Sequence, residues 1–171
     1  MDPVDLFVEH WMQEDNDRSG VLARSVVARI FYLSKVLEAR ANRVLDKHGL
    51  SLSGYDVLEA LKRTGPLTPS QIMRKSLLTS GAVTNRVDRL EQAGLVERKP
   101  SADDRRSQRI VLTRKGQDTV QQALPDKFVM AKTALAGMSE DDMETLANGL
   151  SKLLSFLMQQ EDTPAEAATS K

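Results

Sequence analysis

Apolar residues recur along most of this chain at the three- and four-residue spacing that places them on one face of a helix. The spacing predicts a short amphipathic helix over 4–13 and a long helix over 21–48, which Gly49 ends. Thr68 followed by Pro69 is a typical helix start, because the hydroxyl caps the first turn and proline fits the first helical position. Further helices are predicted after Ser51 or Ser53, over about 69–76 and 80–93, after Thr113 with an interruption at Pro125, and after Ser139.

Two short segments in the middle of the chain have the pattern of strands. Leu95–Lys99 and Arg109–Leu112 flank a polar turn over 100–108. The order of the predicted elements is that of a winged helix-turn-helix: a helix, a short helix, a tight turn, a helix, a strand, a charged loop and a strand. The sequence therefore predicts a mainly α fold with a small β-hairpin wing. A helical bundle with an appended hairpin is the alternative that these elements allow.

The equal numbers of acidic and basic residues, 24 of each, hide a strong asymmetry along the chain. Residues 1–17 carry six acidic and no basic side chains, whereas 63–117 carry twelve basic and five acidic ones. Residues 138–171 are acidic again, with seven acidic against two basic side chains. A basic middle between acidic ends indicates a polyanion-binding lobe on a different kind of scaffold. A solvated surface without a partner is the other interpretation of such a charge run.

The composition of the 171 residues narrows the classes of function. No window approaches 18 consecutive apolar residues, so no transmembrane helix is expected, and the acidic N-terminal segment is unlike a secretory signal. The absence of cysteine excludes disulfides and thiolate metal sites, and two histidines are too few for a metal site. No Gly-rich phosphate loop or nucleophile elbow indicates an enzyme. We therefore expect a cytoplasmic, non-enzymatic protein without metal, cofactor or membrane partner.

The predicted helix over 80–93 has the composition of a helix that reads DNA. It carries small and polar side chains in its first turns and arginines a turn later. A helix of this width fits the major groove of double-stranded DNA and reads base edges with its N-terminal residues. The candidate DNA contacts on this helix and on the short helix before it are Thr68, Ser70, Ser80, Thr84, Asn85 and Arg89.

The charged loop between the two predicted strands is the second candidate DNA contact. Arg105 and Arg106 lie at the tip of the hairpin, from which an arginine can enter a narrow minor groove with its enhanced negative potential. Asp104 lies next to them and is positioned to orient a guanidinium. The helix and the wing are therefore expected to contact neighbouring grooves.

The run SGAVTNRVDRLEQAGLVERKPSADDRRSQRIVLTRKG resembles the recognition helix and wing of the MarR family of bacterial transcription regulators. The D-x-R signature of that family falls on residues 104–106, and its L-T-x-x-G motif falls on 112–116. The resemblance covers about residues 20–160. It implies a homodimer, built by interlocking N- and C-terminal helices, that binds a palindromic DNA operator.

The resemblance and the charge pattern together suggest a division of the chain. A two-fold dimer presents two recognition helices about one turn of DNA apart, which matches a palindromic operator. The expected parts are 1–48 with the extra first helix and a dimerisation helix, 49–116 as the winged helix-turn-helix lobe, 117–160 as C-terminal dimerisation helices, and 161–171 as a disordered tail.

A second, narrower resemblance concerns the urate-responsive branch of the same family. The segment 4–13 adds a helix before the long one and carries the single tryptophan, and the motifs G-Y-D, T-N-R and L-V-E-R stand at the places of the branch's urate site. The resemblance implies that Trp11 stacks on a flat purine. It implies that Arg86 and Arg98 bind the oxygens of the anionic ligand, with paired hydrogen bonds from a planar guanidinium. Asp56 would be repelled by that ligand, which is urate, xanthine or another purine.

The expected mechanism follows from electrostatics. In the free protein Asp56 pairs with one of the two arginines and holds the recognition helix in a pose that binds DNA. The arriving anion competes for that arginine and shifts the helix, so the repressor leaves its operator. The resemblance further implies that the regulated gene encodes an efflux transporter.

Each of the four ligand residues also has a purely structural interpretation. Trp11 can anchor dimer packing, and Asp56 can cap a helix. Arg86 can contact phosphate, and Arg98 can pair with Glu97 or with phosphate. At the level of function, a MarR-type regulator that responds to phenolic carboxylates or antibiotics is the alternative. An enzyme or a purely structural dimer is the alternative from another class.

Overall fold

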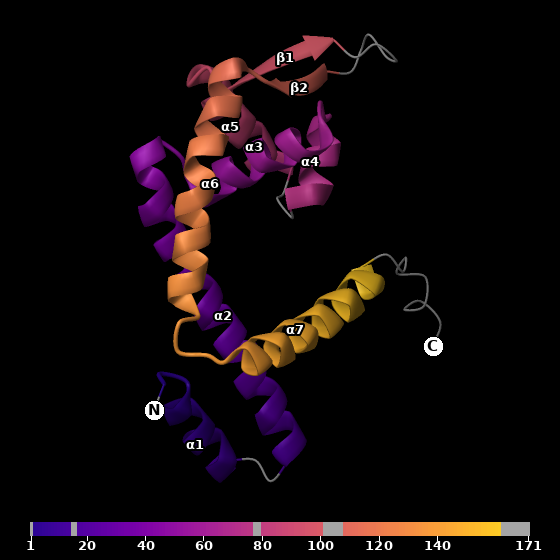
Figure 1. Cartoon of the computed structure of the whole chain (residues 1–171). Helices are drawn as coiled ribbons and strands as arrows, with labels where there is room; N and C mark the ends of the chain where they lie inside the picture. The colour runs from indigo at the N-terminus through magenta and orange to yellow at the C-terminus, as the bar shows by residue number, and fades with distance from the viewer. Residues whose placement is uncertain (1, 15–16, 77–79, 101–107, 162–171) are drawn as a thin grey trace, which may run out of the picture. The chain divides into compact units, whose positions relative to one another are not determined.

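The chain folds into helices and one β-hairpin (Figure 1), which confirms the predicted fold class. The computed structural model describes residues 2–14, 17–76, 80–100 and 108–161, with only the backbone of Ser80 and Glu161. It divides into two compact units, 1–130 and 131–171. The elements are α1 (Asp5–Glu14), α2 (Arg18–Leu45), the 3-10 turn η1 (Asp46–His48), α3 (Leu52–Thr64), α4 (Pro69–Ser76), α5 (Ser80–Gln92), β1 (Val96–Pro100), β2 (Gln108–Leu112), α6 (Arg114–Ala134) and α7 (Glu140–Glu161).

The helix ends follow the capping signals in the sequence. Gly49 has a φ of 66° and ends η1 in the left-handed conformation that glycine tolerates. Ser51 caps α3, where its Oγ accepts a hydrogen bond from the backbone N of Gly54 at 3.2 Å. Gln71 Oε1 accepts from the backbone N of Thr68 at 2.9 Å, and Thr68 Oγ1 accepts from the backbone N of Gln71 at 3.3 Å. This capping box confirms the predicted start of α4.

The predicted interruption at Pro125 is wrong, because α6 continues through it. Proline in a helix interior removes one backbone donor, so a helix that contains it needs support from its surroundings. Val120 and Ala123 are buried before the proline. After it, Asp126 bonds to His48 and Lys47 in η1, and Lys127 bonds to Asp56 on α3. Burial of side chains before Pro125 and ion pairs after it thus support α6 on both sides of the proline.

One core joins α3, α4, α5, the hairpin, the end of α2 and the first half of α6, and we call this part, residues 45–124, the lobe. On each helix the buried side chains recur every three or four residues and so share one face, as the amphipathic pattern predicts. The largest fully buried ones are Tyr55, Leu45, Leu58, Ile72 and Ile110.

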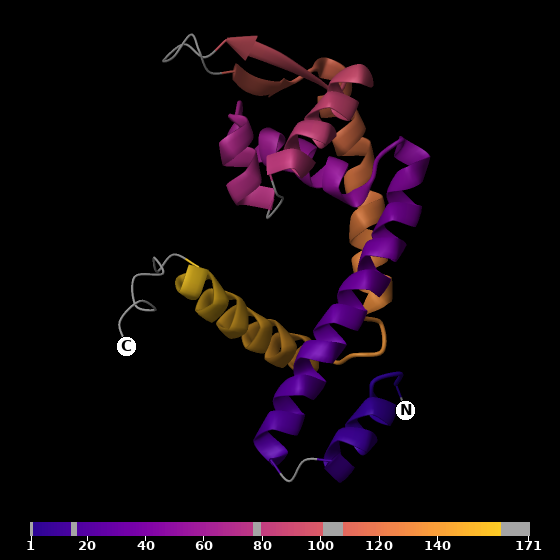
Figure 2. The ribbon, with the colours of Figure 1, turned by 180° about the vertical axis from the view of Figure 1, so that it is seen from behind.

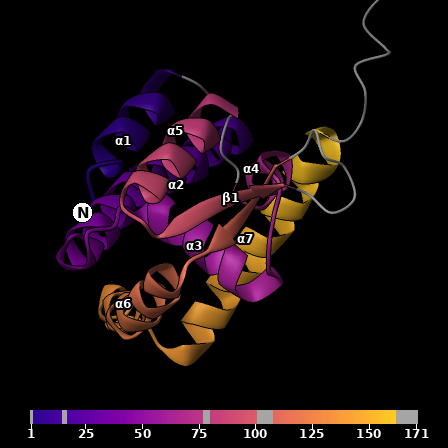
Figure 3. The ribbon, with the colours of Figure 1, turned by 90° about the horizontal axis from the view of Figure 1, so that it is seen from above.

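The hairpin is anchored to the lobe at its base, and in Figure 3 it lies beside α5. Its strands pair antiparallel with Arg98 opposite Ile110 and begin or end within one residue of the predicted bounds. Ile110 also donates its backbone N–H to the carbonyl of Leu67 at 2.7 Å and accepts from the Leu67 N–H at 3.1 Å. This bridge joins the wing to the segment between α3 and α4.

The start of α6 is fastened to the turn that follows α5, and we call this fastening, Gly94, Leu95, Thr113 and Gly116, the clasp. Thr113 donates its backbone N–H to the Leu95 carbonyl at 3.1 Å and its hydroxyl to the Gly94 carbonyl at 2.7 Å. A Cβ on Gly116 would lie 1.9 Å from the Leu95 carbonyl oxygen, so this position requires glycine. The clasp gives a physical reason for the threonine and the glycine of the L-T-x-x-G motif.

α1 lies along the first half of α2 (Figure 2) and is attached by charge and by Val4, which is buried. Arg29 on α2 pairs with Asp2 at 2.8 Å and with Asp5 at 2.5 Å. Most large apolar side chains of these two helices are exposed instead of buried. They are Leu6, Phe7, Met12, Leu22, Val26, Val27, Phe31, Tyr32, Leu33 and Leu37.

The second unit contains α7, which begins where the sequence predicts. The backbone N of Asp142 donates to Ser139 Oγ at 3.2 Å, so Ser139 caps the helix. The tail predicted to be disordered lies outside the described residues beyond 161. In the described part of the chain no helix has the length and apolar character to span a bilayer. The exposed large apolar side chains of α7 are Leu146, Leu150, Leu154, Phe156, Leu157 and Met158.

Candidate functional site

α4 and α5 form a helix-turn-helix whose outer face carries polar side chains. One face of α5 packs into the core through the buried side chains of Val83, Val87 and Leu90. This leaves Thr84, Asn85 and Arg89 on the exposed face, as the sequence predicts for a helix that reads bases. Thr68 and Ser70 share a hydrogen bond of 3.0 Å between their hydroxyls at the start of α4. Of Ser80 only the backbone is described, at the first residue of α5.

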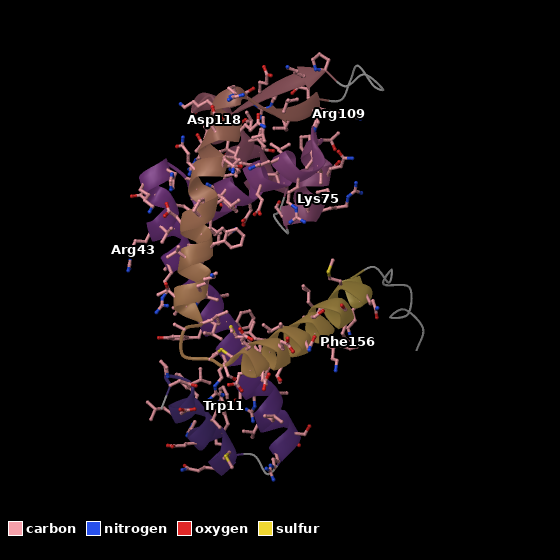
Figure 4. All side chains as sticks on the ribbon, in the orientation of Figure 1. Trp11, Arg43, Lys75, Arg109, Asp118 and Phe156 are labelled. Atoms are coloured by element: carbon pink, nitrogen blue, oxygen red, sulfur yellow. The ribbon has the colours of Figure 1, made fainter. Side chains whose placement is uncertain are left out.

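Sequence reasoning missed two basic residues on α4. Arg74 and Lys75 are exposed in the last turn of this helix, and Lys75 is labelled in Figure 4. They extend the positive charge of the helix-turn-helix beyond α5. The signal was present in the sequence, since the segment 69–76 is short, amphipathic and basic at its end.

The wing is described only in its two strands. The predicted contacts at its tip, Asp104, Arg105 and Arg106, lie outside the described residues. Within the strands, Arg109 is half-buried on β2, and Lys99 on β1 pairs with Glu97 at 2.7 Å.

Arg86 points from α5 toward the start of α3. Its Nη1 donates to Ser51 Oγ at 2.8 Å, whereas its Nε is buried without a hydrogen-bond partner among the described residues. The two residues line a cavity of about 580 Å³ together with Asn42, Asp46 and Arg89. A guanidinium group at the wall of a cavity can bind an anion there.

Asp56 lies on α3 and bonds to a residue that the sequence did not indicate. Lys127 Nζ on α6 lies 3.1 Å from Asp56 Oδ1 and 3.6 Å from Glu59 Oε2. The same ammonium group lies 4.1 Å from the centre of the Tyr55 ring, within the range of a cation–π contact. Asp56 lines a second cavity of about 420 Å³, with Glu59, Arg63 and Lys75 in its wall.

Tyr55 is fully buried beneath Lys127. Burial, with a smaller contribution from the carboxylates of Glu59 and Asp56, raises the pKa of Tyr55 to about 12. Its hydroxyl has no hydrogen-bond partner among the described residues.

Arg98 on β1 is bound to two carboxylates of α5. Its Nη2 lies 2.5 Å from Asp88 Oδ1, its Nη1 donates to Glu91 Oε2, and its backbone N–H donates to Glu91 Oε1 at 3.2 Å. The hydrogen bond to Asp88 raises the pKa of the Arg98 guanidinium above its ordinary value, against the opposing effect of partial burial. The structural interpretation of Arg98 as a salt-bridge partner therefore holds, with Asp88 and Glu91 in place of Glu97.

Trp11 lies on α1, where its ring stacks on Phe7 with 6.2 Å between ring centres, and Arg24 lies 5.2 Å from its centre. From Arg24 to Asn42, at the wall of the Arg86 cavity, α2 spans 18 residues or about 27 Å at a rise of about 1.5 Å per residue. Within one chain, Trp11 is therefore remote from that cavity (Figure 4).

The four predicted ligand residues thus stand at separate places in one chain. Asp56 and Arg86 line different cavities, Arg98 is held by α5, and Trp11 lies along α2. The expected pair between Asp56 and one of the arginines is replaced by the pair with Lys127. Ser51, Asp88, Glu91 and Lys127 are the contacts that sequence reasoning did not foresee.

Comparison with known proteins agrees with this geometry. A family model described as MarR family matches residues 48–107. The regulator PecS of Dickeya dadantii strain 3937 is 31% identical over 140 residues, which cover 79% of this chain and 82% of PecS. The regulator MhqR of Bacillus subtilis strain 168 is 35% identical over 112 residues, which cover 66% of this chain and 77% of MhqR.

Solved structures share the fold. The organohalide-sensing regulator RdhR-CbdbA1625, bound to 2,4-dichlorophenol, superposes with a TM-score of 0.74 at 26% identity, over 79% of this chain and 80% of that one. A mutant of MarR from E. coli complexed with operator DNA gives a TM-score of 0.71 at 23% identity, over 75% of this chain and 93% of that one. These proteins are transcription regulators and not enzymes.

Proposed function

The chain belongs to the MarR family of DNA-binding transcription regulators, and from this premise we propose that it is a repressor released from its operator by urate or a related purine. The observation that carries the DNA-binding half is the exposed row of Thr84, Asn85 and Arg89 on a helix whose other face is buried. The observation that carries the ligand half is the position of Arg86 at the wall of a cavity, where Nη1 donates to Ser51 Oγ.

On DNA, α5 enters the major groove and reads bases with Ser80, Thr84, Asn85 and Arg89. The hydroxyls of Thr68 and Ser70 at the start of α4 bind the phosphate backbone beside it. Arginines at the tip of the wing enter the adjacent minor groove, where the narrow groove enhances the negative potential. The wing residues in this proposal are Asp104, Arg105 and Arg106.

The repressor acts as a homodimer on a palindromic operator. Large apolar side chains are exposed on α1 and α2 and, in the second unit, on α7, and this supports a dimer because clustered apolar exposure is typical of interfaces. Residues 1–48 and 117–160 supply the dimer contacts, and 49–116 bind DNA. Two-fold symmetry then presents the two α5 helices to two half-sites.

The ligand site needs both copies of the chain. Arg86 and Arg98 bind the oxygens of the purine anion, since a planar guanidinium donates paired hydrogen bonds, and Arg98 leaves Asp88 and Glu91 to do so. Trp11 stacks on the flat ring. Because about 27 Å of α2 separates its neighbour Arg24 from Asn42 at the cavity wall, the second copy supplies it.

Asp56 and Lys127 form the sensor in this scheme. In the free protein Lys127 pairs with Asp56 and Glu59 and offsets part of their negative charge. An anion that binds nearby attracts Lys127 and repels Asp56, which biases α3 and, through it, α5 toward a pose that leaves DNA. A coupling of roughly 1–3 kcal/mol, or about 5–150-fold in affinity, is ordinary for such linkage.

A phenolic effector is the second candidate. It is favoured by the likeness to RdhR-CbdbA1625, whose structure holds 2,4-dichlorophenol. The regulated gene in either case is proposed to be an efflux transporter gene next to that of the regulator.

A gel-shift titration tests the proposal on the DNA directly upstream of the chain's own gene, with urate, with 2,4-dichlorophenol and without ligand. Tight binding relieved by urate is the expected result. Tight binding relieved only by the phenol would replace the effector, and binding that urate leaves unchanged would remove the purine site.

Two variants separate the halves of the proposal. Arg106→Ala is expected to weaken DNA binding and to leave the dimer and urate binding intact. Trp11→Phe is expected to leave DNA binding intact and to blunt the urate response. An unchanged urate response in Trp11→Phe together with Asp56→Asn would show that the ligand set is misassigned.

A further inference from the structure

The wing is joined to the recognition helix, α5, by ion pairs between one half-buried arginine on β1 and two acidic residues of α5. Asp88 and Glu91 stand one turn apart on the same face of α5, at i and i+3. Gly94 reverses the chain with a φ of 71°, and β1 then runs back past that face. Arg98 meets both carboxylates as a result, and we call these three residues the strut.

The strut stands where the hairpin leaves the core. Along β1 burial falls from Val96, which is buried, through Arg98, which is half-buried, to Lys99 and Pro100, which are exposed. On the facing strand Ile110, opposite Arg98, is the buried residue. Beyond this level neither strand has a buried residue among the described positions, and the strut joins β1 to α5 at this level.

The chemistry of the strut suits a mechanical role. Arg98 donates from both of its Nη atoms and from its backbone N–H, and Glu91 accepts two of these three hydrogen bonds with its two oxygens. A guanidinium held by two carboxylates is planar, multiply bonded and fixed in direction, unlike a single lysine contact. The cluster carries two negative charges against one positive charge, so it has little attraction for phosphate in this state.

We propose that Asp88 and Glu91 are positioning residues for DNA binding, which act through Arg98 to set the wing against the recognition helix. A protein that contacts two grooves at once gains from a fixed angle between its two contact elements, because each contact then costs less ordering on binding. The inference rests on the DNA-binding half of the proposed function, and its test is made without effector.

The sign of the effect of mutation separates this role from plain electrostatics. Asp88→Asn and Glu91→Gln each remove a negative charge from a DNA-binding lobe. By charge alone both changes tighten binding to the phosphate backbone. Loss of the strut instead weakens DNA binding. The positioning role and charge alone therefore predict opposite changes in affinity.

The test is a gel-shift titration of the full chain and of the double variant Asp88→Asn/Glu91→Gln on the DNA upstream of the gene. Weakening by at least tenfold is expected. The control is Glu97→Gln, which removes one negative charge from β1, the strand of Arg98. Glu97 pairs only with Lys99 among the described ion pairs, so this change leaves the strut intact. Equal or tighter binding is expected for this control. Double-variant binding that is as tight as that of the control would overturn the proposal.

Footprinting on the same fragment distinguishes positioning from loss of folding. Hydroxyl-radical protection by the wing should weaken in the double variant, whereas guanine N7 protection in the major groove should persist. Uniform loss of both kinds of protection would contradict a positioning role. The single variant Asp88→Asn, which keeps Glu91 on Arg98, gives the same comparison if the double variant unfolds. Failure of the unaltered chain to bind any fragment would instead refute the DNA-binding proposal itself.

Discussion

The lobe and the helices that precede it differ in where they put their apolar residues. The lobe buries its apolar residues around Tyr55, Leu58 and Ile110, where they pack against other residues of the same chain. α1 buries none of its residues, and the first half of α2 buries only Val21 and Ser25. The lobe therefore supplies its own hydrophobic core. The helices before it leave apolar surface for another molecule, as the proposed dimer requires.

The largest effect is expected from a cavity in the lobe. Leu58→Ala removes a fully buried side chain, which typically costs about 2–5 kcal/mol of unfolding free energy. Urea denaturation at several protein concentrations measures it, and the loss should appear at every concentration. A loss below 1 kcal/mol would mean that the lobe is less tightly packed than described.

The clasp provides the second test within the lobe. Gly116→Ala places a methyl group against the Leu95 carbonyl oxygen, where 1.9 Å is available, so the backbone must shift. Overpacking of this kind typically costs about 1–3 kcal/mol. Gly137→Ala is the matched control, because a Cβ there meets nothing within 4 Å. Equal stability of the two variants would remove the steric argument.

Outside the lobe the same logic predicts an effect on association instead of folding. Phe31 on α2 is 65% exposed in one chain, and Phe31→Asp places a charge in the proposed interface. We expect the dimer dissociation constant to rise about tenfold or more, as for an interface residue worth at least 1.4 kcal/mol. Sedimentation equilibrium measures it. An unchanged constant would place the dimer contact elsewhere.

A smaller effect of opposite sign is expected at Tyr55. Its hydroxyl is buried without a partner among the described residues, so Tyr55→Phe removes an unsatisfied polar group and keeps the ring under Lys127. The lobe should gain about 1 kcal/mol in stability. Thermal unfolding of both proteins is the measurement. A clear loss of stability would show that the hydroxyl makes a hydrogen bond that matters.

The smallest expected effect depends on pH. Hydrogen bonds from Lys47 and then His48 lower the pKa of Asp126 below its ordinary value of 3.8. The folded state therefore gains stability above that ordinary value and loses it as the pH falls through the lowered pKa. Asp126→Asn should flatten the acid limb of a stability-against-pH curve in this range. Superimposable curves would mean that the pairs with Lys47 and His48 add nothing.

Local signals in the sequence predicted most of the fold. The caps at Ser51, Thr68 and Ser139 fix helix starts by contacts within three residues, so they are legible without tertiary structure. Pro125 misled the prediction because the continuation of α6 depends on partners in η1 and α3 that lie far away in the sequence.

The candidate site was less predictable for the same reason. Residue types at positions 56, 86 and 98 were legible, but their partners depend on packing. Lys127 lies 71 positions from Asp56, and Ser51 lies 35 positions from Arg86. The acids that hold Arg98 are nearer, at spacings of 7 and 10, and the reversal at Gly94 is the signal that could have revealed them.

The clasp has a mechanical consequence. Thr113 is bonded to Gly94 and Leu95, and Gly116 lies against the Leu95 carbonyl, so the end of α5 and the start of α6 are joined at one place. The base of the wing lies at the same junction. A shift of α6 is therefore expected to reach the end of α5 and the base of the wing without passing through α3 or α4.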